Sequence, residues 1–198
     1  LGADQSGFIN EIGFEMYQRI LDEAIEELKE DKFQKLFKDE KKKFTVKDCQ
    51  LDTDEEVLIP DDYVSNIEER LNLYKELNQI KDNDSLISFE QKLKDRFGKL
   101  PDKIAVLFNA IKLRWVGKKL GFEKIVLKNN SLRAFFTTDK NSNYFESIYF
   151  KKIMNYLREN PNDCQVKENR GKLSLRKEGI MEINQALGLF NKLINQKT

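Results

Sequence analysis

The sequence has no histidine, only two cysteines and only three prolines among its 198 residues. The absence of histidine removes the commonest general base, the commonest metal ligand and every Ser-His or Cys-His catalytic arrangement. Cys49 and Cys164 lie far apart and have no CxxC spacing. Neither a zinc site nor a disulfide framework is therefore expected, and a reducing, cytoplasmic setting fits this cysteine usage better.

Phosphate-binding motifs and membrane segments are also missing. Neither GxxxxGK[ST] nor GxGxxG occurs, so no nucleotide site and no cofactor is implied. No apolar run approaches the roughly 18 residues that span a bilayer, and no signal-peptide pattern is present. Charged residues make up 35% of the chain, so carboxylate pairs at helical spacing are expected on solvated faces. We expect a soluble protein with no catalytic residue and no metal site.

Charge is abundant but balanced, since 35 basic and 34 acidic residues leave a formal net charge of +1. The basic excess that is typical of nucleic-acid-binding proteins is therefore absent, although charge can still be segregated on one face. The hydrophobic fraction of 39%, with 14 Phe, is enough for the core of one ordinary domain, with or without a helical appendage.

The first 43 residues differ from the rest of the chain. The sequence opens without an initiator Met, as expected for a segment that follows another domain. Residues 14–30 have apolar side chains at a spacing of three to four and predict an amphipathic helix. The charge run at 29–44 is interpreted as a solvated linker in preference to a nucleic-acid arm, which places a domain boundary after residue 43.

A short strand with a slip or bulge is predicted at 44–52, followed by three helices. Ser65 and Glu68 form an S-x-x-E capping box for the first helix. The second helix is predicted at 85–97. Its inward stripe consists of Leu86, Phe89, Leu93 and Phe97.

Glycine and proline mark the junction between the second and third helices. Gly98 is predicted to take a positive φ after the second helix, and Pro101 to occupy the first position of the third. The third helix is expected to run to Leu120 with Trp115 in the core. The adjacent carboxylates Asp61 and Asp62 are interpreted as a turn and helix-start device rather than a catalytic pair.

Beyond residue 121 the chain predicts two hairpins, each followed by a helix. Asn129 and Asn130 can form the first turn with positive φ, and Arg170-Gly171 marks the second. Asn143 and Glu146 are a possible capping pair for the intervening helix. The final helix has a stripe that consists of Ile183, Leu187, Phe190 and Ile194. The predicted fold class is α+β, with an N-terminal helical part followed by a mixed or antiparallel sheet part.

Three stretches resemble one known family. Residues 1–25 resemble the end of the RecG-like translocase module of bacterial transcription-repair coupling factors. Residues 58–77 and 94–121 resemble the C-terminal domain of that family. The resemblance implies that 1–43 is the tail of the translocase module, with a hook-like helix and a charged linker, and that 44–198 is the regulatory C-terminal domain.

The resemblance also implies a parent protein and its partners. The parent would be an ATP-dependent translocase on double-stranded DNA that removes stalled RNA polymerase and recruits nucleotide excision repair. The C-terminal domain would pack on the N-terminal, UvrB-like region of the same chain and mask the surface that recruits UvrA. Gln5, Ser6 and Gly7 would be a remnant of the motor-coupling loop. The segment itself is expected not to be an enzyme.

Asp95, Arg96 and Lys92 are the candidate interdomain residues. Asp95 and Arg96 form either a local surface ion pair or half of an interdomain set of salt bridges. With the resemblance taken into account, the two interpretations have equal weight. Lys92 and Lys94 make this helix face more basic than is expected for the family.

Two other functions remain open. The first is a DNA-binding accessory domain of a helicase, which would use residues 29–43 and the lysines at 112–124. The second is a small enzyme with a carboxylate site, and the lack of histidine disfavours it.

Overall fold

A computed structural model describes residues 46, 48–138, 143–169 and 171–196. The predicted helix at 14–30, the linker, the domain boundary after residue 43 and the loop at Gln5, Ser6 and Gly7 lie outside the described residues. The described chain forms two compact units, one containing 57–105 and the other containing 46–56 and 106–196. The division falls within helix α4 (Asp102–Leu120).

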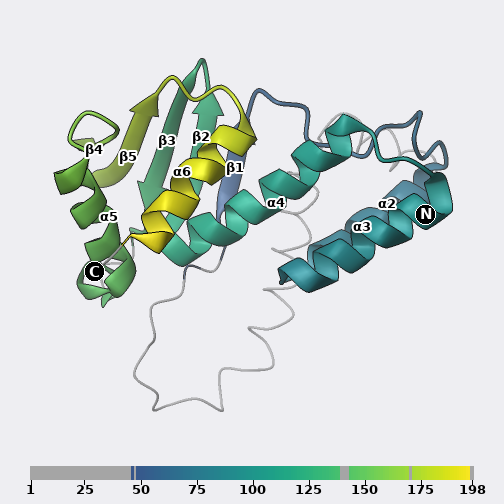
Figure 1. Cartoon of the computed structure of the whole chain (residues 1–198), viewed down its shortest axis with the longest axis horizontal. Coiled ribbons are helices and arrows are strands. Elements are labelled where there is room, and N and C mark those ends of the chain that lie inside the picture. The colour runs from purple at the N-terminus through teal and green to yellow at the C-terminus, as the bar shows by residue number, and fades with distance from the viewer. Residues whose placement is uncertain (1–45, 47, 139–142, 170, 197–198) are drawn as a thin grey trace, which may run out of the picture. The chain divides into compact units, whose positions relative to one another are not determined.

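The first unit is built from helices α2 (Ile67–Gln79) and α3 (Asn83–Phe97) together with the beginning of α4. The loop before α2 is attached by a buried hydrogen bond, in which the Ile59 amide donates to the Tyr74 hydroxyl at 2.7 Å. The buried side chains of this unit are Ile59, Pro60, Val64, Leu73, Tyr74, Leu77, Leu86, Phe89, Leu93 and Ile104. In Figure 1, α2 and α3, which are coloured blue to teal, lie along each other.

The helix ends of this unit differ in part from the sequence prediction. The N-cap of α2 is Asn66, whose side chain accepts from the Glu69 amide at 2.9 Å, so the predicted box of Ser65 and Glu68 is wrong by one residue. Asp82 caps α3 by accepting from the Ser85 amide at 2.8 Å, which starts this helix earlier than predicted. Gly98 ends α3 with φ of 85°, a conformation that L side chains rarely adopt. The prediction for Gly98 is confirmed.

The second unit contains a five-stranded sheet in the order β1-β2-β3-β5-β4. The strand β1 is parallel to β2, and all other neighbours are antiparallel. The strands are β1 (Gln50–Thr53), β2 (Phe122–Lys128), β3 (Ser131–Phe136), β4 (Gln165–Asn169) and β5 (Lys172–Glu178). The mixed sheet and the order of hairpin, helix, hairpin and helix confirm the predicted α+β class.

One face of this sheet carries the core of the second unit. Helices α4, α5 (Ile148–Glu159) and α6 (Ile183–Asn195) contact it through Gly117, Phe150 and Phe190 respectively. Figure 1 shows α4 and α6 crossing in front of the strands. Phe122 of β2 lies 5.1 Å from Phe190 of α6, and Phe136 of β3 lies 5.8 Å from Phe150 of α5, measured between ring centroids. Within the part of the chain that the structure describes, no helix is both long and apolar enough to cross a membrane.

The hairpin turn at Asn129 and Asn130 has φ of 52° and 58° at the two residues, as a type I′ turn requires. That prediction is confirmed. Asn143 does not cap the following helix: residues Asn143–Glu146 form a 3₁₀ turn, η1, and Ser147 caps α5 by accepting from the Phe150 amide at 3.2 Å.

Two predictions of burial on the helices of the second unit are wrong. Leu187 and Ile194 are only half-buried, because α6 faces the core with a neighbouring stripe. That stripe consists of Ile183, Ala186, Leu189, Phe190 and Leu193. Trp115 is also only half-buried and does not belong to the core.

Candidate interaction surface at the end of helix α3

The predicted candidate residues lie at the C-terminal end of α3, in the first unit. Leu86, Phe89 and Leu93 turn their side chains into the core of that unit. Because each helical residue advances by about 100°, Asp95 lies roughly opposite Leu86 and points away from the core. Asp95 and Arg96 are both exposed, as the sequence predicts.

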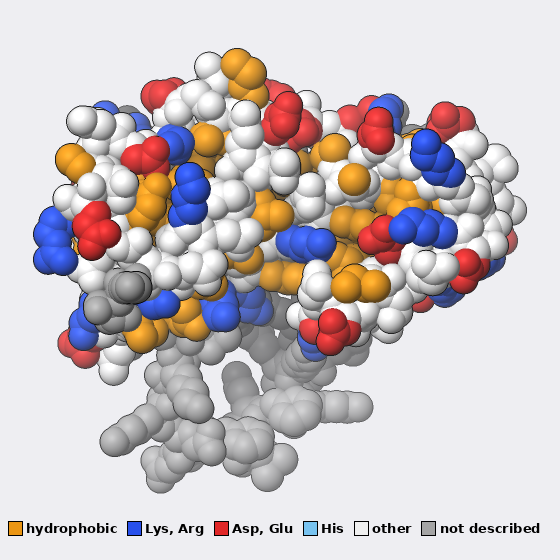
Figure 2. Space-filling model, in the orientation of Figure 1, with side chains coloured by type: hydrophobic (Ala, Val, Ile, Leu, Met, Phe, Trp, Pro, Cys, Tyr) orange, Lys and Arg blue, Asp and Glu red, His pale blue; other side chains and the backbone are white. Residues whose placement is uncertain are grey.

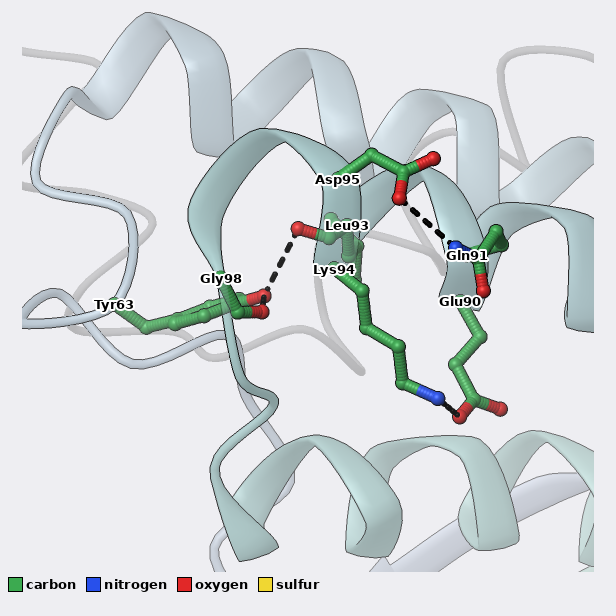
Figure 3. Close-up of polar contacts among 7 residues, drawn as sticks. All are labelled: Tyr63, Glu90, Gln91, Leu93, Lys94, Asp95 and Gly98. Atoms are coloured by element: carbon green, nitrogen blue, oxygen red, sulfur yellow. Dashed lines mark hydrogen bonds and ion pairs between the residues drawn. The ribbon is translucent and has the colours of Figure 1, made fainter.

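Asp95 makes a local contact that leaves its carboxylate at the surface. The Gln91 side-chain amide, one turn earlier on α3, donates to Asp95 Oδ1 at 2.8 Å (Figure 3). Lys94 and Glu90 form a similar pair one turn apart, with 2.6 Å between Nζ and Oε1. Both contacts are spaced by four residues, so they support the helix and hold the side chains along its outer side.

Arg96 and Lys92 bind carboxylates of the neighbouring helix. Arg96 Nη1 lies 2.8 Å from Glu69 Oε1, and Lys92 Nζ lies 2.5 Å from Glu76 Oε2. Glu69 is near the start of α2 and Arg96 near the end of α3, so the two helices are antiparallel. Both ion pairs join α3 to α2. Arg96 keeps 43% of its side chain exposed and Glu69 keeps 29%. Such partly exposed pairs contribute about 0–1 kcal/mol each.

The end of α3 is attached to the preceding loop by Tyr63. Its hydroxyl donates to the carbonyl oxygens of both Leu93 and Gly98, each at 3.1 Å (Figure 3). The Tyr63 ring meets the Phe97 ring edge-on at 5.8 Å between centroids. The Arg96 guanidinium carbon lies 5.0 Å from the centroid of the Phe97 ring, at a distance typical of a cation–π contact.

Tyr63 is a positioning residue that the sequence analysis missed. Desolvation raises the pKa of the Tyr63 hydroxyl above its ordinary value, so the group remains a donor at neutral pH. An aromatic residue directly after the Asp61-Asp62 turn was the available signal, but a local pattern does not reveal a partner thirty residues away. Tyr63 therefore fixes the position of the end of α3, which carries Asp95 and Arg96, within the first unit.

The surface around this end mixes both signs of charge. Figure 2 shows basic and acidic side chains interspersed over the visible part of the first unit, with apolar side chains between them. A mixed surface attracts no partner over a long range, but it selects a partner whose charges are complementary at short range. This arrangement suits specific protein contact more than bulk attraction of a polyanion.

The lysines at 112–124 do not form one surface. Lys112, Lys118 and Lys119 belong to α4, which contacts the core face of the sheet. The Lys119 ammonium lies 5.9 Å from the centroid of the Tyr149 ring. Lys124 belongs to β2 and points to the opposite face, because its neighbour Ile125 is fully buried in the core.

The thiols of the second unit are structural. Desolvation by burial is the main cause that raises the pKa of Cys49, and it raises the pKa of Cys164 to about 11. Neither thiol therefore supplies a thiolate nucleophile at neutral pH. Across residues 46–196, apart from the gaps at 47, 139–142 and 170, no group of three or more His, Cys, Asp or Glu residues is arranged to hold a metal ion.

Two polar clusters of the second unit were also missed from the sequence. Arg114 of α4 donates to the Cys49 carbonyl at 2.9 Å and pairs with Asp48 at 2.7 Å, which attaches the chain before β1. Glu123 accepts from the Thr137 hydroxyl at 2.6 Å and from the Thr138 amide at 2.9 Å. Both clusters tie strand ends to neighbouring segments and are structural.

Residues 53–147 match the model of the TRCF domain family. The transcription-repair-coupling factor of Escherichia coli (strain K12) is 32% identical over 125 residues, which cover 63% of this chain and 10% of that protein. The transcription-repair-coupling factor of Buchnera aphidicola subsp. Acyrthosiphon pisum is 35% identical over 130 residues, which cover 66% of this chain and 15% of that protein.

A longer alignment and a solved structure extend the similarity. The transcription-repair-coupling factor of Rickettsia prowazekii is 27% identical over 193 residues, covering 94% of this chain and 16% of that protein. The chain thus spans 10 to 16% of the length of these curated relatives. The crystal structure of a C-terminal domain of transcription-repair coupling factor matches with a TM-score of 0.56 and 19% identity, over 72% of this chain and 93% of that one. Residues 53–147 therefore carry a TRCF domain, and the chain is similar in fold to a C-terminal domain of a transcription-repair coupling factor.

Proposed function

We propose that this chain restrains a larger, ATP-dependent DNA translocase by binding another region of the same protein. The bound region would be the UvrB-like N-terminal part, and the contact would mask the surface that recruits UvrA. The observation that carries this proposal is the exposed carboxylate of Asp95 on a helix end that Tyr63 holds in place. The relatives named transcription-repair-coupling factor supply the context of repair.

The restraint would act as a shift between a closed and an open population of the parent protein. Contact with the UvrB-like region would desolvate Asp95 and pair it with a cation of that region. Losing one partner of a buried charge pair costs about 2–5 kcal/mol. Even the lower value changes a closed-to-open ratio by about 30-fold, which is enough to expose a masked surface in a substantial fraction of molecules.

The test is the substitution Asp95→Lys in the full-length parent. We expect it to increase binding of UvrA in the absence of RNA polymerase and DNA, measured by pull-down or by surface plasmon resonance. Among the described residues of the first unit, the Asp95 carboxylate accepts the exposed hydrogen bond from Gln91. Surface substitutions of this kind change stability by at most about 0.5 kcal/mol, so the melting temperature of the isolated chain should barely change.

Asp84→Lys is the matched control, because Asp84 is an exposed carboxylate in the first turn of the same helix. It should leave UvrA binding unchanged while costing about 0.3–1 kcal/mol of stability through the helix dipole. Equal UvrA binding by wild type and by the Asp95 variant would show that the restraint does not act through this end of α3.

Substitutions at Arg96 can distinguish its contact with Glu69 within the first unit from a contact with the UvrB-like region. Arg96→Glu breaks the pair with Glu69, and the double exchange Glu69→Arg with Arg96→Glu reforms it with reversed signs. If Arg96 acts only through Glu69, the exchange restores wild-type masking of the surface that recruits UvrA. If Arg96 also binds the UvrB-like region, the exchange restores stability but leaves UvrA binding elevated.

The remaining parts of the proposal concern the parent. Residues 44–198 would be the regulatory domain, and residues 1–43, with Gln5, Ser6 and Gly7, would be the tail of the translocase module. ATP hydrolysis would reside elsewhere in the parent, which would act in the cytoplasm on double-stranded DNA and RNA polymerase. The isolated chain should show no ATP turnover in a radiolabelled-phosphate assay, and turnover that copurifies with the chain through two orthogonal columns would contradict this assignment.

A further inference from the structure

Among the described residues of the second unit, helices α4, α5 and α6 contact one face of the sheet and leave the other face without a helix. Core residues of the strands alternate with residues that point to the other side. The burial of β3 follows this alternation, because Leu132, Ala134 and Phe136 are buried while Ser131, Arg133 and Phe135 are half-buried. Helices α4, α5 and α6 contact the buried side, through Gly117, Phe150 and Phe190 respectively.

Basic residues gather on the unused side. The register of the strands places six of them there: Lys124, Lys128, Arg133, Lys167, Lys172 and Arg176. The same register places two carboxylates on this side, Asp52 and Glu178. Asp52 binds Lys128 at 2.5 Å, and Glu178 accepts from the Ser131 hydroxyl at 3.2 Å. The balanced net charge of the chain therefore conceals a local positive excess.

Two arginines face each other at the centre of this side. Arg133 of β3 is the direct register partner of Arg176 of β5, so their Cβ atoms are about 4.5–5.5 Å apart, and like charges directly opposite each other are destabilising. Arg176 Nε donates to the Ser174 hydroxyl at 3.2 Å. Arg133 Nε is buried and has no hydrogen-bond partner among the described residues. An anion bound to the two guanidinium groups would relieve the repulsion between them.

The neighbouring row adds an aromatic ring between cations. Across the strands, Lys124, Phe135, Ser174 and Lys167 lie side by side in register. At about 4.8 Å per strand this row is about 14 Å long. Phe135 is half-buried and Lys167 is exposed.

We propose that this basic sheet face, defined by Lys124, Arg133, Phe135, Lys167 and Arg176, binds the backbone and one base of a single-stranded nucleic acid. The two arginines would hold a phosphate, the two lysines would flank it, and Phe135 would stack on a base. Sheets with an aromatic residue on an open face and cations around it bind single strands in this way. An acidic peptide would satisfy the arginines but would leave the ring of Phe135 without a stacking partner.

The test is fluorescence anisotropy of the whole chain with a labelled oligothymidylate of about 12 nucleotides, at several salt concentrations. Replacing both Arg133 and Arg176 by Gln should weaken binding at least about 10-fold and reduce the salt slope by about 0.7, since the two arginines hold one phosphate and each phosphate contact on a single strand contributes about 0.7. Phe135→Leu keeps the apolar bulk but loses the stacking surface. It should weaken binding about 10-fold without changing the salt slope.

The matched control replaces Lys151 and Lys192 by Gln, which removes the same charge from exposed positions on α5 and α6. We expect it to bind the oligonucleotide within about two-fold of wild type. Equal weakening by the control and the arginine variant would overturn the proposal, because binding would then follow net charge alone. Absence of oligonucleotide binding would also overturn it. Displacement of the oligonucleotide by an equal concentration of oligoglutamate would overturn the choice of nucleic acid as the occupant. Thermal melts of each variant verify that it is folded.

Discussion

The ring of Tyr144 occupies the space that a side chain at residue 121 would need. A Cβ atom built on Gly121 would lie 2.0 Å from Tyr144 Cε2, and Gly121 has φ of 88°. The Tyr144 hydroxyl donates to the carbonyl of Leu120, the last residue of α4. The end of this helix is thus closed by an aromatic ring that requires glycine beside it.

Gly121→Ala should therefore be strongly destabilising. A positive φ costs an alanine about 1–2 kcal/mol, and the overlap with the Tyr144 ring adds about 1–3 kcal/mol. Gly179→Ala is the matched control, because Gly179 has φ of 77° and nothing within 4 Å of its Cβ position. Urea unfolding of both variants should give a clearly larger loss for Gly121→Ala. Equal losses would show that backbone conformation alone requires glycine at residue 121.

Gly117 and Gly188 lie inside helices, and alanine should affect them in opposite directions. A Cβ on Gly117 would lie 2.9 Å from both Cys49 Sγ and Ile125 Cδ1, whereas a Cβ on Gly188 would meet nothing within 4 Å. Alanine is favoured over glycine in a helix by about 1 kcal/mol. Gly188→Ala should raise the free energy of unfolding by up to that amount. Gly117→Ala should lower it by up to about 2 kcal/mol net, because overpacking costs about 1–3 kcal/mol.

Adding Cys49→Ala to Gly117→Ala should recover part of the loss at Gly117, because it removes the sulfur atom that the new methyl group approaches. The four proteins of this double-mutant cycle are compared by urea unfolding. A coupling energy near zero would mean that Ile125 alone limits the space at Gly117.

The pair between Glu69 and Arg96 should contribute little to the stability of the isolated chain. Because Arg96 keeps 43% of its side chain exposed, a double-mutant cycle with Glu69→Gln and Arg96→Gln should give about 0.2–1 kcal/mol, decreasing with added salt. A coupling above about 2 kcal/mol would make the pair a structural element of the first unit. In that case changes in UvrA binding by Arg96 variants would report unfolding of the first unit and not its release from the UvrB-like region.

The contribution of Asp163 to the free energy of unfolding should decrease in acid. Burial alone would raise the pKa of its carboxyl, but hydrogen bonds from Lys177 and Tyr156 outweigh this effect and hold the pKa below its ordinary value. A carboxyl whose pKa is lower in the folded protein contributes stability above its unfolded pKa, about 3.9, and loses it as the pH falls through the folded value.

Asp163→Asn should therefore cost about 1 kcal/mol at pH 7, at the low end for a charged hydrogen bond because nearly a third of the side chain stays exposed. The difference between wild type and this variant should shrink below about pH 4. Urea unfolding at several pH values measures it. Asp62→Asn, at an exposed turn residue, is the control, and a difference of equal size at every pH would show that Asp163 acts through packing.

Several elements could be predicted from the sequence because a local signal specifies them. Gly98 and the Asn129-Asn130 turn need positive φ, and few residue types supply it. Leu86, Phe89 and Leu93 of the predicted stripe of α3 are buried, as helical spacing predicts, whereas Phe97 at the end of the helix is only half-buried. The exposure of Asp95 follows from the same helical geometry. The wrong helix starts have a physical reason too. Ser65 and Asn66 are both good N-caps, and the surrounding structure decides which of the two caps α2.

The sequence by itself determined the order of helices and hairpins, the absence of histidine chemistry and the family resemblance, because these depend on residue types and short spacings. Only the tertiary structure decided that β1 pairs in parallel with β2, a strand about seventy residues later. It also decided that Arg96 meets Glu69, that Tyr63 holds the end of α3, and that the basic residues of four strands share one face. These relationships join residues that are far apart in the chain, and no local propensity encodes the partner of a side chain once several partners of the same chemistry are available.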